Sequence, residues 1–335
     1  MAEGVNVALP VNVAPPVNVA VVGATGLVGE AVLAALTERE FPIGELFALG
    51  RDDVDGETVL FADRPKRLKP LAGFDFSRCR FAFFCTPTEV SAAHARRAAA
   101  AGCTVIDLSG QFRLDAGVPL VAADANAASA TAGLIASPSA EVVQLAAVLA
   151  PLQAAVGLRR VHVTTLLSVS DRGRAGVAEL AGQTARLLNV QGIEPKAFPA
   201  QIAFNVLRQG DAPDVGAELR KVLGNPELVV ESGSFHVPVF YGHSQSLRVE
   251  TDQPIAVEQA RKLLRKAAGI KLSDRGAAPS PVGDGTGEDR VLVGRIEALS
   301  DGGNGLLLWT LADNVRKGAA VNSVQIAETL LKAHP

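Results

Sequence analysis

Residues 17–29 read VNVAVVGATGLVG, an apolar run that leads into three glycines spaced three residues apart. The run before Gly23 is typical of a buried strand, and the small residues after it are typical of a tight turn that opens a helix. Glycines at this turn let backbone N–H groups approach a pyrophosphate at the helix N-terminus. The stretch therefore predicts a dinucleotide-binding loop. The residues expected to contact the cofactor are Gly23, Thr25, Gly26, Leu27, Val28 and Gly29.

Beyond residue 29 the sequence keeps alternating between strand-like and helix-like segments. The runs ELFALG, RFAFFC and TVIDLS read as strands, and GLVGEAVLAALTE and VSAAHARRAAAAG read as helices. Such alternation predicts a doubly wound parallel sheet. From about residue 157, longer runs such as RRVHVTTLLSVS and DRVLVGRIEAL predict a second domain on a mixed or antiparallel sheet. The closing stretch GAAVNSVQIAETLLKA is amphipathic, and we expect it to pack back on the first domain.

These segments predict an α/β protein with a Rossmann-type nucleotide-binding domain and an α+β substrate and dimerisation domain. We expect the first domain to comprise residues 17–130 and 314–335, and the second residues 131–313. Residues 1–16 contain repeats of VNVA that are interrupted by prolines. Prolines disrupt regular pairing, so this segment is expected to be a flexible arm.

Composition excludes several classes of function. The 335 residues carry a net charge of −3 without a basic stripe, so we expect no nucleic-acid partner. No apolar run of about 18 residues occurs, so no membrane span is expected. No group of residues has metal-ligand spacing, so no metal is predicted. Cys79, Cys85 and Cys103 are too few for a disulfide framework and favour the cytoplasm, with Cys85 expected to be a buried small residue.

The second strand ends in a segment that bears on the choice of cofactor. Arg51 would suit the 2′-phosphate of NADP, whereas Asp52 or Asp53 would suit the free 2′-hydroxyl of NAD. All three residues are also plausible as ordinary loop charges. The residues themselves therefore leave NADP and NAD open.

Five motifs occur in order along the chain: VAVVGATGLVG, VIDLSGQFR, SPSA before an apolar helix, VPVFYGHS and DNVRKGAAVNSVQIAETL. From about residue 17 onward the chain resembles the aspartate-semialdehyde dehydrogenase family, most closely its Usg-type branch. N-acetyl-glutamyl-phosphate reductases fit these motifs less closely. The resemblance implies a homodimer of an amino-acid biosynthesis family, a cofactor that is slightly more consistent with NADP, and a cofactor-binding role for Asn314.

The family reduces aspartyl phosphate through a cysteine thioester, and the resemblance places three departures in that active site. Ala140 stands at the position of the cysteine, His236 at that of an arginine that grips the substrate carboxylate, and Leu167 at that of a glutamine that orients the acyl group. A methyl group cannot attack a carbonyl, and imidazole cannot form a bidentate pair with a carboxylate. By the same resemblance, His243 retains the position of the base and Arg113 that of the phosphate-binding arginine.

Some assignments have two readings. Arg113 could bind a phosphate, or could pair with an acidic neighbour such as Asp107 or Asp115. Ser137 could be a nucleophile, but a serine followed by Pro138 is more typical of a helix N-cap with proline at the first helical position.

The family's acid and lysine before the last substrate strand also have two matches. One is Asp211 and Asp214, and the other is Glu218 and Lys221, which have the same type of spacing. We leave both open at this point.

The sequence thus predicts a dinucleotide-binding pseudoenzyme that lacks the family's phosphorylating aldehyde dehydrogenase activity and acts through binding or dimerisation. One alternative is an NAD(P)-dependent oxidoreductase of altered chemistry, with direct hydride transfer near His243 to an aspartate-semialdehyde-like substrate. Another is an interaction protein whose nucleotide pocket is vestigial. The expected partners are a second copy of the chain and a small ligand bearing a phosphate or carboxylate.

Overall fold

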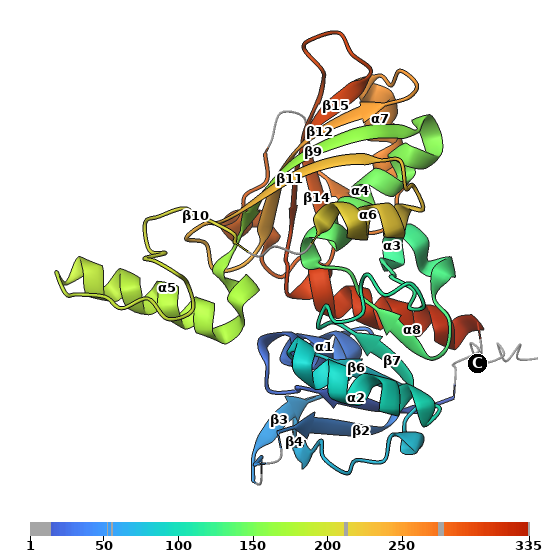
Figure 1. Ribbon diagram of the computed structural model, residues 1–335, viewed down its shortest axis with the longest axis vertical. Coiled ribbons are helices and arrows are strands. Elements are labelled where there is room, and N and C mark those ends of the chain that lie inside the picture. Colours follow the sequence, from blue (N-terminus) through green and yellow to red (C-terminus); the bar gives the residue numbers. More distant parts are fainter. Residues whose placement is uncertain (1–14, 52, 55, 211–213, 274–277, 334–335) are drawn as a thin grey trace, which may run out of the picture.

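The computed structural model describes residues 15–51, 53–54, 56–210, 214–273 and 278–333. Two sheets make up the molecule, one in each of two domains that lie end to end along its long axis (Figure 1). The first sheet is parallel and the second is mixed, which confirms the predicted fold class. Most of the predicted N-terminal arm lies outside the described residues.

The first sheet has the strand order β5-β2-β1-β6-β7-β8, and all of its strands are parallel. It includes β8, which lies after residue 130. The strands are β1 (Val17–Val22), β2 (Ile43–Gly50), β5 (Lys69–Pro70), β6 (Phe81–Phe84), β7 (Thr104–Asp107) and β8 (Leu134–Ala136), with a separate hairpin of β3 (Thr58–Phe61) and β4 (Arg64–Arg67).

Helices cover both faces of this sheet, which explains why the central parts of β1, β2 and β6 are apolar. Val19 and Val21 face α1 (Leu27–Glu38) and the closing helix α8 (Asn322–Ala333), as expected for that closing stretch. Ala20 and Val22 face the other side, where α2 (Thr88–Ala100) packs. A strand buried on both faces cannot alternate apolar and polar residues.

The second sheet has the order β10-β11-β9-β12-β15-β14-β13. The helices α4 (Ala140–Val156), α6 (Val215–Leu223) and α7 (Val257–Lys266) pack in the same core as this sheet. Its strands are β9 (Leu158–Leu167), β10 (Leu207–Arg208), β11 (Val229–His236), β12 (His243–Thr251), β13 (Ile270–Leu272), β14 (Val291–Ala298) and β15 (Gly305–Ala312). The short helix α3 (Ala123–Asn126) lies before α4 in the chain.

A helical arm projects sideways from the second domain (Figure 1). It consists of α5 (Gly173–Leu188) and the segment up to residue 206, and it has a small apolar cluster of its own around Leu180 and Phe198. Its outer surface carries the exposed apolar residues Leu188, Val190, Phe204 and Val206.

The start of α4 lies at the contact between the two domains. A π-helical turn, Arg316–Val321, packs against both α1 and α4. A Cβ atom added to Gly318 would lie 2.6 Å from the Cβ of Ala140, so glycine is required for this close approach. The closing segment of the chain therefore supports the beginning of α4 directly.

Candidate functional site

The glycine loop forms one wall of the candidate site. Gly23 has a φ of +78°, and a Cβ added there would lie 2.4 Å from the carbonyl oxygen of Cys85. A Cβ on Gly29 would lie 2.2 Å from the carbonyl oxygen of Gly23. Gly26 is the N-cap of α1 and has no side chain to cap it. The loop therefore presents bare backbone at a helix N-terminus, which suits a pyrophosphate group.

A cavity of about 620 Å³ opens from this loop, and its lining includes Gly23, Thr25, Gly26, Arg51, Glu57 and Cys85. Leu27 and Val28 begin α1 beside it. The Arg51 side chain is largely exposed and lies 3.3 Å from the carboxylate of Asp53, whereas Asp52 lies outside the described residues. Cys85 is half-buried, and its thiol has a pKa raised by burial.

Asn314 lies outside this cavity and forms hydrogen bonds with residues of the second domain. Its Oδ1 atom accepts hydrogen bonds from the backbone N–H of Gly242 at 3.0 Å and from the hydroxyl of Ser168 at 3.0 Å. Asn314 is buried and does not contribute to the lining of the cavity at the glycine loop. Its cofactor role stays a prediction.

The start of α4 is the second part of the candidate site. The helix begins at Ala140 with Ser139 as N-cap, so the expectation that Ser137 caps it with Pro138 at the first position is wrong. The reason is that the Ser137 hydroxyl accepts a hydrogen bond from the side-chain amide of Asn322 at 2.9 Å. The Glu218 carboxylate instead accepts a hydrogen bond from the Ser139 backbone N–H at 2.7 Å.

Three predicted positions come together at one end of the second sheet. Leu167 and His236 are paired and end the parallel strands β9 and β11, while His243 begins the antiparallel β12 beside β9. Side chains alternate between faces along a strand, so His243 shares a face with Gln245. Gln245 donates through Nε2 to the carbonyl oxygen of Glu141 in α4 at 3.1 Å. This row of residues therefore faces the start of α4.

His243 is fully buried and has a defined hydrogen-bonding direction. Its Nδ1 atom lies 3.2 Å from the backbone nitrogen of Ser168, whose N–H must donate. The neutral ring consequently carries its proton on Nε2, which has no hydrogen-bond partner among the described residues. Burial lowers the pKa of His243 to about 4. At neutral pH the imidazole is therefore a hydrogen-bond donor rather than a free base.

The Arg113 guanidinium is held by neighbouring groups of the protein. Nη1 lies 3.4 Å from the Glu218 carboxylate, and Nε donates to the carbonyl oxygen of Ser137 at 3.1 Å. Its ionic partner is Glu218 rather than Asp107 or Asp115. This arginine supports the turn before α4.

Lys221 is committed in the same way. Its Nζ atom donates to the carbonyl oxygens of Arg113, Asp115 and Val118 at 2.9, 2.7 and 2.8 Å. An ammonium group has three protons, so these contacts use all of its donors.

The position of α6 decides between the two matches for the family's acid and lysine. Glu218 and Lys221 are on the helix and contact the loops at the start of α4. Asp214 is the N-cap of α6, where its side chain accepts a hydrogen bond from Ala217 N–H at 2.8 Å. Asp211 lies outside the described residues. The geometry favours Glu218 and Lys221.

Sequence reasoning missed Asp171, in the 3-10 turn Val169–Arg172 after β9. Its Oδ2 lies 3.1 Å from Nε2 of His236, and its Oδ1 lies 3.9 Å from Nε2 of His243. Burial raises the pKa of the Asp171 carboxyl, but the hydrogen bond from His236 and the nearby positive charges outweigh it and leave the pKa lowered. A signal existed, because Asp171 follows four residues after Leu167, which the resemblance places at a departure from the family's active site.

Glu141 was also missed. Its carboxylate is buried beside the Ser234 hydroxyl at 3.3 Å, and Oε1 has no hydrogen-bond partner among the described residues. Burial, with added repulsion from Asp171 and Glu218, raises the pKa of Glu141 to about 7. No sequence pattern distinguishes this glutamate from an exposed one in a helical first turn.

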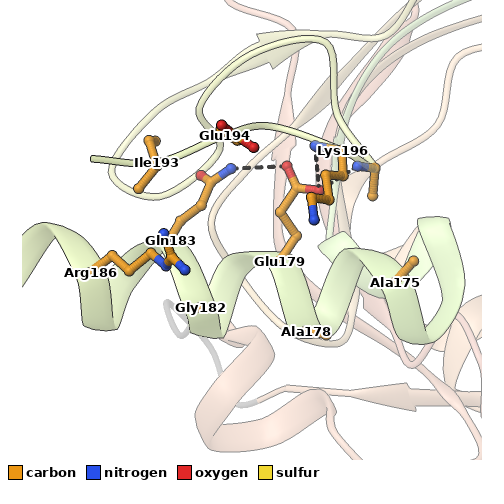
Figure 2. A pocket seen from close by; sticks show the side chains of 10 residues that line it. Ala175, Ala178, Glu179, Gly182, Gln183, Arg186, Ile193, Glu194 and Lys196 are labelled. Atoms are coloured by element: carbon orange, nitrogen blue, oxygen red, sulfur yellow. Dashed lines mark hydrogen bonds between the residues drawn. The ribbon is translucent and has the colours of Figure 1, made fainter. Parts of the chain in front are cut away.

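A different hollow, of about 490 Å³, lies on the arm between α5 and the segment that follows it (Figure 2). The polar side chains in it have structural partners. Glu179 accepts hydrogen bonds from the backbone N–H groups of Lys196 and Ala197, and Gln183 donates to Glu179 at 2.9 Å. This hollow contains none of the predicted site residues.

The described part of the chain has no metal-binding cluster and no membrane-spanning helix. It contains no cluster of three or more His, Cys, Asp or Glu side chains arranged to hold a metal ion. None of its helices combines the length and apolar character needed to cross a membrane.

A glycine loop at the edge of a parallel sheet, together with a second domain on a mixed sheet, defines a two-domain dinucleotide-binding protein of the dehydrogenase type. Family models agree with this class. Residues 18–132 match the NAD binding domain of semialdehyde dehydrogenases, and residues 149–317 match their dimerisation domain. The chain belongs to the aspartate-semialdehyde dehydrogenase family.

Individual relatives cover nearly the whole chain. Aspartate-semialdehyde dehydrogenase 2 of Vibrio cholerae is 43% identical over 93% of this chain and 97% of its own length. A USG-1 protein homolog of Pseudomonas aeruginosa is 41% identical over 93% of this chain and 97% of its own length. The structure of aspartate semialdehyde dehydrogenase II from V. cholerae complexed with ASA has a TM-score of 0.92 at 41% identity, covering 96% of this chain and 99% of that one.

The first domain is therefore a nicotinamide-dinucleotide-binding domain, as predicted. The glycine loop fits a dinucleotide, because a Cβ added at Gly23 or Gly29 would overlap backbone atoms of the turn that approaches the pyrophosphate. The match does not separate NADP from NAD.

Proposed function

We propose that this protein binds a nicotinamide dinucleotide between its domains and does not catalyse the phosphorylating aldehyde dehydrogenase reaction of its family. The observation that carries the proposal is Ala140 at the start of α4. A thioester requires a sulfur nucleophile at this point, and a methyl group has no electron pair to form the bond.

The groups that would hold an anionic substrate support the same conclusion. His236 replaces a guanidinium with a ring that is paired to Asp171. Arg113 and Lys221 direct donors to acceptors within the protein. A substrate with a carboxylate and a phosphate therefore lacks two of the positioning contacts that the family motif supplies.

The test is an assay of semialdehyde- and phosphate-dependent cofactor reduction. We expect no turnover by the wild type, and almost none by Ala140→Cys, whose new thiol should still be alkylated readily at a helix N-terminus. The Ala140→Cys/His236→Arg/Leu167→Gln variant restores the nucleophile and the amide and places an arginine at position 236. Cofactor binding, followed by fluorescence, checks that each variant is folded, and the V. cholerae relative serves as positive control. Turnover by the wild type refutes the proposal.

A second candidate is direct hydride transfer without a thioester. It is favoured by one observation, the proton on Nε2 of buried His243, which could polarise a substrate carbonyl. A screen of aldehydes with reduced cofactor distinguishes it, since the first candidate predicts no oxidation of the cofactor with any of them.

We also propose a homodimer in which the arm contributes to the interface. The match of residues 149–317 to a dimerisation domain supports association through the second domain. Apolar residues on the arm, including Leu188 and Phe204, are exposed in the single chain and suit burial against a second copy.

The proposed compartment is the cytoplasm. Cys79 and Cys103 are buried free thiols, and Cys85 is free and half-buried. Unpaired thiols are typical of a reducing environment.

A further inference from the structure

We propose that a site formed by Asp171, His236 and His243, at the end of the second sheet that faces α4, rejects carboxylates and takes a small ligand that carries a protonated amine. The decisive group is Asp171, which stands beside His236, where the resemblance places the clamp for a substrate carboxylate. The inference deepens the proposed function, because it names the class of ligand that the altered site accepts.

The Asp171 carboxylate has one oxygen held and one available. Oδ2 accepts the hydrogen bond from His236 Nε2 at 3.1 Å, which fixes the orientation of the group. Oδ1 has no hydrogen-bond partner among the described residues, and 31% of the side chain is exposed. A carboxylate oxygen that has a fixed orientation and accepts no hydrogen bond can accept one from an ammonium group.

The turn that carries Asp171 leads directly into α5, which contacts the first domain. Three residues further along the chain, Arg174 donates to the carbonyl oxygen of Thr25 in the glycine loop at 3.4 Å and forms an ion pair with Glu30 in α1. Asp171 is therefore anchored on one side by His236 and, through the start of α5, on the other side by the cofactor loop. A ligand beside the bound cofactor would meet it.

Two buried polar atoms in this region have no hydrogen-bond partner among the described residues. Nε2 of His243 lies 3.9 Å from Oδ1 of Asp171 and has no hydrogen-bond partner among the described residues, although the residue is only 1% exposed. The buried hydroxyl of Ser139, next to Ala140, also lacks a partner there. Buried polar atoms are normally satisfied, so these are contacts left for a ligand or ordered water.

The charges around the site disfavour a carboxylate. The pKa of Asp171 is lowered, so the group is ionised at neutral pH, and the Glu141 carboxyl group lies near it. The positive charge of Arg113 is paired with Glu218. The positive charge of Arg172 also lowers the pKa of Asp171, but Arg172 is the next residue along the chain and is exposed. A carboxylate placed at Oδ1 would therefore face like charge.

One consequence concerns attempts to rebuild the clamp. An arginine at position 236 would lie against Asp171 and form its ion pair with that carboxylate instead of with a ligand. Restoring carboxylate binding therefore needs His236→Arg together with Asp171→Gly. Asp171 is in this sense a specificity-determining residue that acts against the original substrate class.

The experiment measures binding of two four-carbon probes of opposite charge by calorimetry. Succinate and 1,4-diaminobutane are titrated into the full-length protein saturated with NADP, and into a parallel sample saturated with NAD. We expect the diamine to bind at least tenfold more tightly than succinate. Asp171→Asn should reduce this preference at least fivefold, whereas Asp301→Asn, an exposed aspartate paired with Arg248 elsewhere in the second domain, should leave it unchanged.

The arginine variants make the test reciprocal. We expect His236→Arg alone to bind succinate no better than the wild type does, and His236→Arg/Asp171→Gly to prefer succinate. Thermal unfolding confirms that each variant is folded.

Three results would overturn the inference: equal or tighter binding of succinate by the wild type, a preference unchanged in Asp171→Asn, or no binding of either probe. These are separable from the proposed function. Phosphate-dependent turnover by the wild type refutes that function, whatever the charge preference proves to be.

Discussion

Two strand–turn–helix units start from the same parallel sheet, and their turns are built in different ways. In the first, β1 runs into α1 through a loop in which backbone atoms occupy the space that side chains would fill. In the second, β8 runs into α4, where the helix starts with the methyl group of Ala140 and a Glu218 oxygen accepts from the N-cap N–H. One unit keeps its ligand-binding form, and in the other we propose that Ala140 stands in place of the nucleophile that the family's reaction requires.

The difference follows from what each unit is made of. A phosphate site built from main-chain geometry is tied to the fold, because any side chain at Gly23 or Gly29 would strike backbone. A catalytic site built from side chains can change one residue at a time while the chain continues to fold. Ala140 is an example, since Gly318 supports the same helix start whatever chemistry position 140 carries.

The sharpest way to break this comparison is to place a side chain in the first unit. Gly29→Ala would put a Cβ 2.2 Å from the Gly23 carbonyl oxygen. We expect the free energy of unfolding to fall by about 3 kcal/mol and cofactor affinity to fall at least ~100-fold. Calorimetry and denaturant titration measure both quantities.

Gly182→Ala is the matched control, because a Cβ there meets no atom within 4 Å in the middle of α5. It should stabilise the protein by about 0.5–1 kcal/mol and leave cofactor binding unchanged. Normal cofactor affinity in Gly29→Ala would show that the loop does not depend on its glycines.

The second unit should show a pH dependence that the first lacks. The pKa of Glu141 is about 7 in the folded chain against a reference value of 4.5, mainly because of burial. The folded state therefore holds a proton that the unfolded state releases, and stability falls as pH rises from about 4.5 through 7. We expect Glu141→Gln to gain up to about 3 kcal/mol over the wild type by pH 8 and to show no gain at pH 4.

Denaturant unfolding across that pH range provides the measurement, with Glu231→Gln, an exposed glutamate on β11, as control. If the wild type and Glu141→Gln have parallel pH profiles, the carboxyl of Glu141 is ionised at neutral pH in the folded protein.

The smallest effect concerns the arm, which belongs to neither unit. Leu188 at the end of α5 is 73% exposed and Leu60 on β3 is 71% exposed, so the two leucines differ in location rather than in accessibility. We expect Leu188→Glu to weaken dimerisation about tenfold and Leu60→Glu to leave it unchanged, because only the arm is proposed to meet a second copy.

Sedimentation at a series of micromolar concentrations measures both dissociation constants. A wild-type chain that is monomeric at micromolar concentration contradicts the dimer itself, and equal effects of the two variants contradict the role of the arm.

The sequence predicted the parts of this protein that local patterns encode. Strand and helix periodicity defined both sheets, and the glycine loop follows from its spacing. The motif positions His236 and His243 were identified one by one, and the structure places them together at one sheet end.

What the sequence left undetermined depends on contacts between distant segments. Whether Arg113 faces a ligand or Glu218 is decided by the packing of α6. The helix N-cap moved from Ser137 to Ser139 because Asn322, 185 residues away, takes the Ser137 hydroxyl. The raised pKa of Glu141 arises from burial, and the sequence of this apolar helix does not show whether its single glutamate is buried.

The contact between Arg174 and the glycine loop has a thermodynamic consequence. Arg174 is in the first turn of α5 and contacts the carbonyl oxygen of Thr25 and the carboxylate of Glu30. The arm that is proposed to join two chains is therefore in contact, at its first turn, with the glycine loop and α1. Whatever free energy a bound dinucleotide adds to or removes from that contact must reappear in the association of the two chains, since linkage between binding equilibria is reciprocal. Cofactor concentration would then set the assembly state, and assembly would in turn set the affinity for cofactor.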